Sequence, residues 1–130
     1  MIKKTLLALS VIAVACAGAF AQQAGIKRTP LQKADFPDGY STVTVSAELA
    51  PGASAGRHTH PGAEIGYVLD GEVDLIVQDQ ETKHLKAGDS WQIAPGVPHD
   101  AKVIGDKPLK FIGIYVVDKT KPLASPAPEK

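Results

Sequence analysis

Cysteine is almost absent from this chain, which has one, Cys16, among its 130 residues. Cys16 lies in a segment that we expect to be removed, so the remaining chain offers neither a disulfide nor a thiolate metal ligand. A lipidated cysteine is a minor alternative, since the preceding residues Ala13, Val14 and Ala15 match a lipoprotein signal poorly. Any metal ion must then be held by nitrogen and oxygen atoms.

Long hydrophobic runs are also missing, apart from one near the N-terminus. Residues 1–21 combine a basic start (Lys3, Lys4), an apolar stretch (residues 6–15) and the ending Ala-Phe-Ala. This pattern predicts a secretory signal peptide that is cleaved before Gln22, and therefore an exported protein, periplasmic or secreted. A membrane anchor is disfavoured, because the apolar run is shorter than the roughly 20 residues that span a bilayer.

The chain has no excess of one charge. It contains 14 basic and 14 acidic residues, and removal of Lys3 and Lys4 leaves 12 against 14, a net charge of −2 with neutral histidines. No basic stripe or polybasic patch is present, which argues against nucleic acid and anionic lipid as partners of the mature chain. No internal repeat is visible, so we expect residues 22–130 to form one domain with one core.

The folded part is expected to lie between two irregular ends. Residues 22–39 suit an extended lead-in, and residues 118–130, with three prolines, are predicted to form a disordered tail. Between them no stretch keeps a helical period. Short runs bounded by Gly, Pro or Asp instead predict strands over residues 40–49, 64–69, 72–77, 82–85, 90–93, 99–103 and 109–117. Many short strands indicate an all-β sandwich or barrel over residues 40–117.

Two local features bear on how these strands pair. Asp70-Gly71 favours a primed turn, which predicts a hairpin between residues 64–69 and 72–77. The last strand is apolar on both faces, and its second face carries Ile112, Ile114 and Val116. A strand of a small antiparallel barrel normally exposes one face to solvent. The second face therefore indicates a homodimer interface, with cover by the lead-in as the alternative.

Three histidines and a glutamate are the candidate functional residues. His58 and His60 are two residues apart, so on a strand their imidazoles point the same way. A straight strand would carry Glu64 roughly 13 Å from His60, and Pro61-Gly62 supplies the bend that brings it closer. His99 follows the rigid segment Ala94–Pro98.

Other polar residues have weaker claims to a function. A lone histidine is more often a surface or hydrogen-bonded residue than a ligand, and we assign His84 in this way. Trp91 and Gln92 lie on opposite faces of one strand, so one of them is expected to face the pocket as a substrate-binding residue. Core or surface positions are the commoner role for each.

The candidate residues lie in two motifs that resemble those of the cupin superfamily. The first motif is Gly, five residues, His-x-His, three or four residues, Glu, six residues and Gly. Every fixed position is matched, by Gly52, His58, His60, Glu64 and Gly71. The second motif is Gly, five residues, Pro-x-Gly, two residues, His, three residues and Asn. It is matched by Gly88, Gly96 and His99, with Ala94 and Val103 in place of its Pro and Asn.

The resemblance, which covers residues 40–117, implies a single double-stranded β-helix, the cupin or jelly-roll barrel. It implies one divalent transition metal ion, bound by His58, His60, Glu64 and His99, with positions left open for water or substrate. Such ligands suit Mn, Fe, Ni, Co or Zn. Similar cupins include dioxygenases, decarboxylases, isomerases and non-catalytic binding proteins. We expect a metalloenzyme for a small oxygen-rich organic substrate, with a metal-dependent small-ligand-binding module as the alternative; the catalytic residues are unknown.

Overall fold

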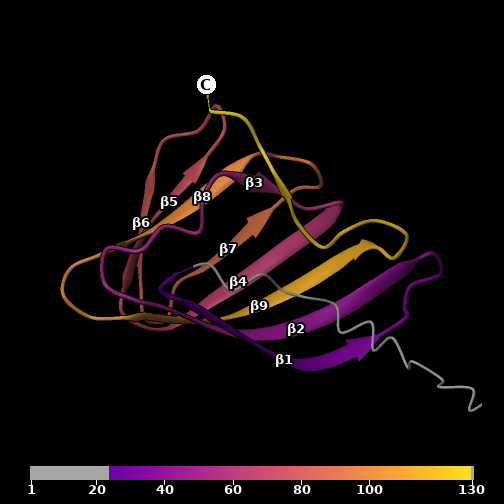
Figure 1. Ribbon diagram of the computed structural model, residues 1–130, viewed down its shortest axis with the longest axis horizontal. Coiled ribbons are helices and arrows are strands. Elements are labelled where there is room, and N and C mark those ends of the chain that lie inside the picture. Colours follow the sequence, from indigo (N-terminus) through magenta and orange to yellow (C-terminus); the bar gives the residue numbers. More distant parts are fainter. Residues whose placement is uncertain (1–23, 130) are drawn as a thin grey trace, which may run out of the picture.

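The protein is an all-β barrel of two five-stranded antiparallel sheets, which a computed structural model describes for residues 24–129 (Figure 1). The strand order is β1-β2-β9-β4-β7 in the first sheet and β10-β3-β8-β5-β6 in the second. The strands are β1 (Ile26–Ala34), β2 (Tyr40–Leu49), β3 (His58–Thr59), β4 (Gly62–Asp70), β5 (Glu72–Val77), β6 (Lys83–Lys86), β7 (Ser90–Ile93), β8 (His99–Ile104), β9 (Leu109–Asp118) and β10 (Ser125–Pro126). The predicted all-β class is confirmed.

The core lies between the two sheets, because alternate residues of each strand are apolar and point inward. β2, for example, buries every second side chain, among them Val45 and Leu49. Inward side chains of both sheets meet in one cluster, to which Leu49, Val68, Leu109 and Phe111 of the first sheet and Val73, Leu75 and Val103 of the second belong. Each such side chain stabilises the fold by roughly 1.5–3 kcal/mol relative to its exposed state.

The turn at Asp70-Gly71 does not form the predicted hairpin, and that prediction was wrong. β4 pairs with β7 and β9, whereas β5 pairs with β6 and β8, so the turn carries the chain from one sheet to the other. Both edges of β4 and both edges of β5 are occupied by other strands, so neither strand has an edge left for the other. Gly71 has a φ of 81°, and a Cβ there would lie 2.4 Å from the carbonyl oxygen of Pro108. Glycine is required for this crossing.

The lead-in is part of the barrel. Residues 26–34 form β1, which pairs with β2 at the edge of the first sheet. β1 therefore widens the sheet and does not lie across the outer face of β9. On that face Ile112, Ile114 and Val116 are half-buried, and Ile65 and Tyr67 of the neighbouring strand β4 are exposed.

The C-terminal segment also differs from the disordered tail that the sequence suggested. Residues 125–126 form β10, which pairs with β3 in the second sheet. The yellow segment in Figure 1 leaves the end of β9 and runs past β3. Its prolines exclude a helix, yet the short strand needs only two residues in register.

The predicted signal peptide, with Cys16 and all but two residues of the stretch before β1, lies outside the described residues. Within residues 24–129, no helix is long and apolar enough to cross a membrane.

Candidate metal centre

Side chains from both sheets converge at one end of the barrel. Glu64 lies near the start of β4 in the first sheet, whereas His58 and His99 are opposite each other on β3 and β8 of the second. With His60, they offer four ligand atoms that all lie within 4.8 Å of one another. Metal–ligand bonds of about 2.0–2.2 Å place opposing donors about 4 Å apart. The structure thus brings together all four sequence-predicted residues in a group that can hold one ion.

The predicted bend between His60 and Glu64 is the place where the chain passes from the second sheet to the first. Gly62 begins β4 beside the backbone of β9. A Cβ on Gly62 would lie 2.0 Å from the carbonyl oxygen of Val116. Only glycine permits this close approach, and the approach brings Glu64 back towards the histidines.

The backbone fixes the orientation of each imidazole. The Nδ1 atoms of His58 and His60 lie 2.6 Å from the carbonyl oxygens of Gly56 and Leu123, and that of His99 lies 2.9 Å from the carbonyl oxygen of Val97. A carbonyl only accepts hydrogen bonds, so each Nδ1 carries the hydrogen and donates it. The Nε2 atoms are left for the centre, which is the usual arrangement of a metal-binding histidine.

The charges of the centre are strongly coupled. Burial raises the pKa of Glu64, but its contacts with His60 and His99 outweigh burial and hold the pKa of the carboxyl well below its usual range. Burial lowers the pKa of His58 to about 4, and the neighbouring imidazoles add to this effect. Burial also lowers the pKa of His99, but the 2.8 Å hydrogen bond from its Nε2 to Glu64 prevails and leaves that pKa raised. His58 is therefore neutral at pH 7, and Glu64 is ionised.

One atom of the centre is left without a partner. The Nε2 of His60 is buried, lies 3.1 Å from Oε2 of Glu64, and has no hydrogen bond among the described residues. A buried polar atom without a partner costs free energy. Three imidazoles, a carboxylate and this unpartnered nitrogen fit a divalent ion of the transition series.

Trp91 and Tyr115 flank Glu64 on the inner face of the first sheet. The indole Nε1 of Trp91 donates to Oε1 of Glu64 at 3.3 Å. Tyr115 is the cross-strand neighbour of Glu64, and its ring centroid lies 4.8 Å from that of His60. Burial and the Glu64 charge raise the pKa of Tyr115, so its phenol stays neutral. Gln92, the other tentative substrate-binding residue, is exposed on the outer face beside Ile65 and is not part of the centre.

Two glycines make room for these aromatic rings. Gly66 and Gly113 are paired across β4 and β9. A Cβ on Gly66 would lie 2.1 Å from the Trp91 ring, and one on Gly113 would lie 2.8 Å from the Tyr115 hydroxyl. Tyr115 was not among the predicted site residues, because it lies on a strand with two apolar faces. Its place beside Glu64 follows only from the strand register.

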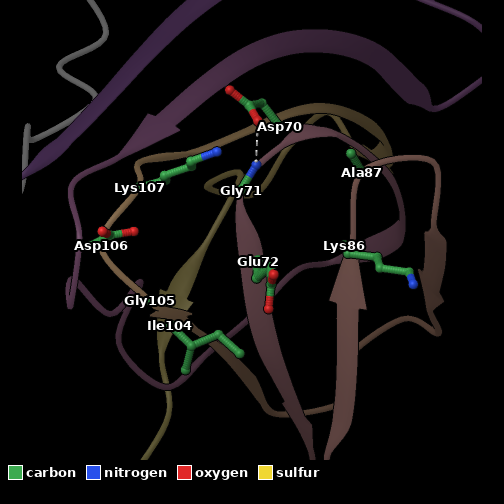
Figure 2. Close-up of a pocket in the computed structure, with 9 residues that line it drawn as sticks. All are labelled: Asp70, Gly71, Glu72, Lys86, Ala87, Ile104, Gly105, Asp106 and Lys107. Atoms are coloured by element: carbon green, nitrogen blue, oxygen red, sulfur yellow. Dashed lines mark hydrogen bonds between the residues drawn. The ribbon is translucent and has the colours of Figure 1, made fainter.

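Two further polar features lie away from the centre. His84 is exposed on β6, where Asp74 and Glu72 contact its ring nitrogens, in agreement with its assignment to the surface. Figure 2 shows a pocket of about 320 Å³ lined by residues that include Asp70, Lys86 and Lys107. This pocket lies past the final residues of β4 and β8, whereas the metal ligands lie near the first residues of these strands.

The fold and the centre together define a double-stranded β-helix with a group of residues that can bind a metal ion. The model of the cupin domain family matches residues 45–116, and the chain belongs to this family. Its first and second motifs provide the four residues of the centre.

Comparison with known proteins gives relatives with different roles. The chain is 48% identical over 50 residues to the HTH-type transcriptional regulator PuuR of Escherichia coli (strain K12); these residues are 38% of this chain and 26% of that protein. The match thus spans about a quarter of the regulator. An uncharacterised protein with a double-stranded β-helix domain from Klebsiella pneumoniae superposes with a TM-score of 0.68 at 23% identity, over 83% of this chain and 89% of that one. Oxalate oxidase in complex with glycolate gives a TM-score of 0.64 at 22% identity, over 84% and 58%. These two structures support the fold alone.

Proposed function

We propose that the protein is a mononuclear metalloenzyme that acts on a small, oxygen-rich organic substrate. The observation that carries the proposal is the orientation of the three imidazoles. Each Nδ1 donates its hydrogen to a backbone carbonyl, and the Nε2 atoms of His60 and His99 lie 3.1 and 2.8 Å from Oε2 of Glu64. Four protein ligands leave positions of an octahedral ion free for an oxygen donor. A bound ion would supply Lewis-acid chemistry or, if it is Fe, oxygen chemistry.

The residues around the metal centre support binding of a polar molecule at a site that is shielded from water on one side. Tyr115 belongs to a buried apolar cluster with Val43, Val45 and Val117, which keeps water away from this side of the centre. Its phenol stays neutral beside the Glu64 carboxylate, so it adds no second negative charge to the centre. Trp91 holds the other carboxylate oxygen of Glu64 and acts as a positioning residue.

A non-catalytic, metal-dependent ligand-binding module is the second candidate. It is favoured by the 48% identity, over 50 residues, to a transcriptional regulator, because a regulator requires ligand binding and not turnover. The same centre serves both functions, so the two differ only in what happens to the bound molecule.

The test begins with the metal content of the purified protein, measured by elemental analysis beside His58→Ala and the surface control His84→Ala. We expect loss of the ion in His58→Ala alone. Equal metal content in all three proteins would exclude the proposed centre. The Fe- and Mn-loaded proteins are then assayed for oxygen consumption and product formation with diols, flavonols and keto acids. Turnover supports the enzyme, and saturable binding without turnover supports the module.

We further propose that the protein is exported, because residues 1–21 have the composition of a signal peptide. Expression of the full chain followed by mass spectrometry is expected to give a periplasmic or secreted product that begins at Gln22. A product that keeps residues 1–21 and stays in the cell would contradict this.

A further inference from the structure

The C-terminal segment, residues 122–129, pairs with β3 at the edge of the second sheet and contacts the metal centre, and we call it the strap. It follows the last barrel strand after a turn in which the amide and hydroxyl of Thr120 donate to Asp118. The strap lies outside the matched cupin segment, which ends at residue 116. It nevertheless contacts two of the four residues of the centre.

The first contact is with His60. The Nδ1 hydrogen of His60 is donated to the carbonyl oxygen of Leu123 at 2.6 Å. The other two imidazoles are held by carbonyls of their own neighbourhood, Gly56 and Val97, two residues away in each case. His60 is different, because its partner is 63 residues away in the sequence. Its tautomer and ring orientation therefore depend on a segment that pairs with no strand of the first sheet.

The second contact is with β3, which carries His58. β10 of the strap pairs with β3, and the amide of Ala127 donates to the carbonyl of Arg57 at 3.0 Å. The Arg57 side chain donates from Nε to the carbonyl of Pro128 at 2.9 Å and from Nη2 to Gln78 at 2.6 Å. Arg57 thus connects the strap to the turn after β5 through its planar guanidinium.

A third contact holds the strap against the barrel interior. The Leu123 side chain packs on the buried cluster that contains Tyr115 and Val117. One apolar side chain, one short strand pair and one arginine are few attachments for eight residues. The strap is consequently the least firmly held part of the centre.

We propose that the strap is a coupled part of the metal centre: docking of residues 122–129 positions His60, and metal binding in turn stabilises the docked strap. Coupling between two binding events is reciprocal, so each must strengthen the other by the same factor. The proposal rests on the metal centre of the proposed function. Leu123 acts through its backbone as a positioning residue, and the strap gives this cupin a site whose affinity depends on its own C-terminus.

The test measures Zn²⁺ affinity by calorimetry for the full chain, for a chain that ends at Lys121, and for Leu123→Ala and Arg57→Lys. Loss of a partner that orients a metal ligand typically weakens binding about 10–100-fold, and we expect this range for the truncated chain and a smaller loss for the point variants. Glu129→Gln, at the exposed end of the strap, is the matched control and is expected to bind as the parent does.

Two readouts separate positioning from a loss of stability. The nitrogen resonances of His60 in NMR report which ring nitrogen is protonated, and this tautomer is expected to become mixed in the truncated chain. Hydrogen exchange of the Ala127 amide in the full chain is expected to slow when Zn²⁺ is added. If the truncated chain does not fold, the Zn²⁺ affinities of Leu123→Ala and Arg57→Lys decide whether the strap positions His60.

The outcomes distinguish the two proposals. A full chain that does not bind Zn²⁺ overturns the metal centre. The strap proposal is overturned if the full chain binds Zn²⁺, the strap variants bind it with an affinity within twofold of the full chain, and Zn²⁺ does not change the hydrogen exchange of the Ala127 amide. The metal centre would remain supported by that result.

Discussion

Gly66→Ala tests whether the packing beneath Glu64 serves the metal centre. The new Cβ would lie 2.1 Å from Cε2 and Cζ2 of Trp91. Ordinary contact begins at 3.4 Å, so the indole must move by about 1.3 Å, the difference between the two distances. Trp91 is 8% exposed and packs on Phe111 at a centroid distance of 5.2 Å, which leaves little room for this movement. Overpacking of this kind costs about 1–3 kcal/mol.

The same displacement breaks the 3.3 Å hydrogen bond from Trp91 to Glu64. We therefore expect two effects of Gly66→Ala, a lower free energy of unfolding in urea and a Zn²⁺ affinity weakened about 10–100-fold. Trp91→Leu in the same chain removes the clash. The double variant should then lose less free energy of unfolding than the two single variants lose together, while its Zn²⁺ affinity stays low.

Gly105→Ala is the control for the loss of stability alone. Gly105 has a φ of 77° and no atom within 4 Å of its added Cβ, and it lies beside the distant pocket. Alanine in this left-handed conformation costs about 1–2 kcal/mol and should leave Zn²⁺ affinity unchanged. If Gly66→Ala binds Zn²⁺ as tightly as the parent, Trp91 does not orient Glu64 and the reasoning fails.

Three further predictions concern charge and assembly. Hydrogen bonds to Asp74 and Glu72 raise the pKa of His84 in the folded protein. The contribution of His84 to the free energy of unfolding is therefore present below about pH 6.5, the pKa of the unfolded chain, and is lost as pH rises through the folded pKa. His84→Gln should reduce the free energy of unfolding at pH 5.5 and not at pH 9. Metal content should fall below about pH 6, near the reference pKa of histidine, because an imidazole must be neutral to coordinate an ion, and an ion retained to pH 4 would refute this. The homodimer stays a prediction: light scattering should show a dimer that Tyr67→Lys converts to a monomer, and a monomeric parent would exclude it.

Local patterns predicted the strands well because period-two alternation is a property of the segment itself. β2, β5 and β7 have the predicted bounds, and β4, β6, β8 and β9 differ by one or two residues at an end. The pairing of the strands was harder to predict from the sequence than their positions. The Asp70-Gly71 turn has hairpin chemistry, but strands distant in sequence occupy both edges of β4. β1, β3 and β10 were missed. β1 and β10 contain prolines and mixed polarity, and β3 and β10 are only two residues long, too short to show an alternating pattern.

The candidate centre was predictable as far as its motifs reach. His58, His60 and Glu64 converge as their spacing and the bend at Gly62 indicated, and His99 joins them as the resemblance to the second cupin motif implied. The groups that orient them were not predictable. A backbone carbonyl has no sequence signature, so nothing marked Leu123. The hydrogen bond from Trp91 to Glu64 requires the space left by Gly66, and this space can be recognised only when the strand register is known.

The distribution of the four residues over the two sheets has a mechanical consequence. Glu64 belongs to the first sheet, whereas His58 and His99 belong to the second, and their side chains meet across the interior. An ion held between them is a cross-link that joins the two sheets in addition to the short chain segment between His60 and Glu64. Chelation would remove this cross-link, so amide exchange should quicken at the start of β4 and β8 before it changes at their far ends.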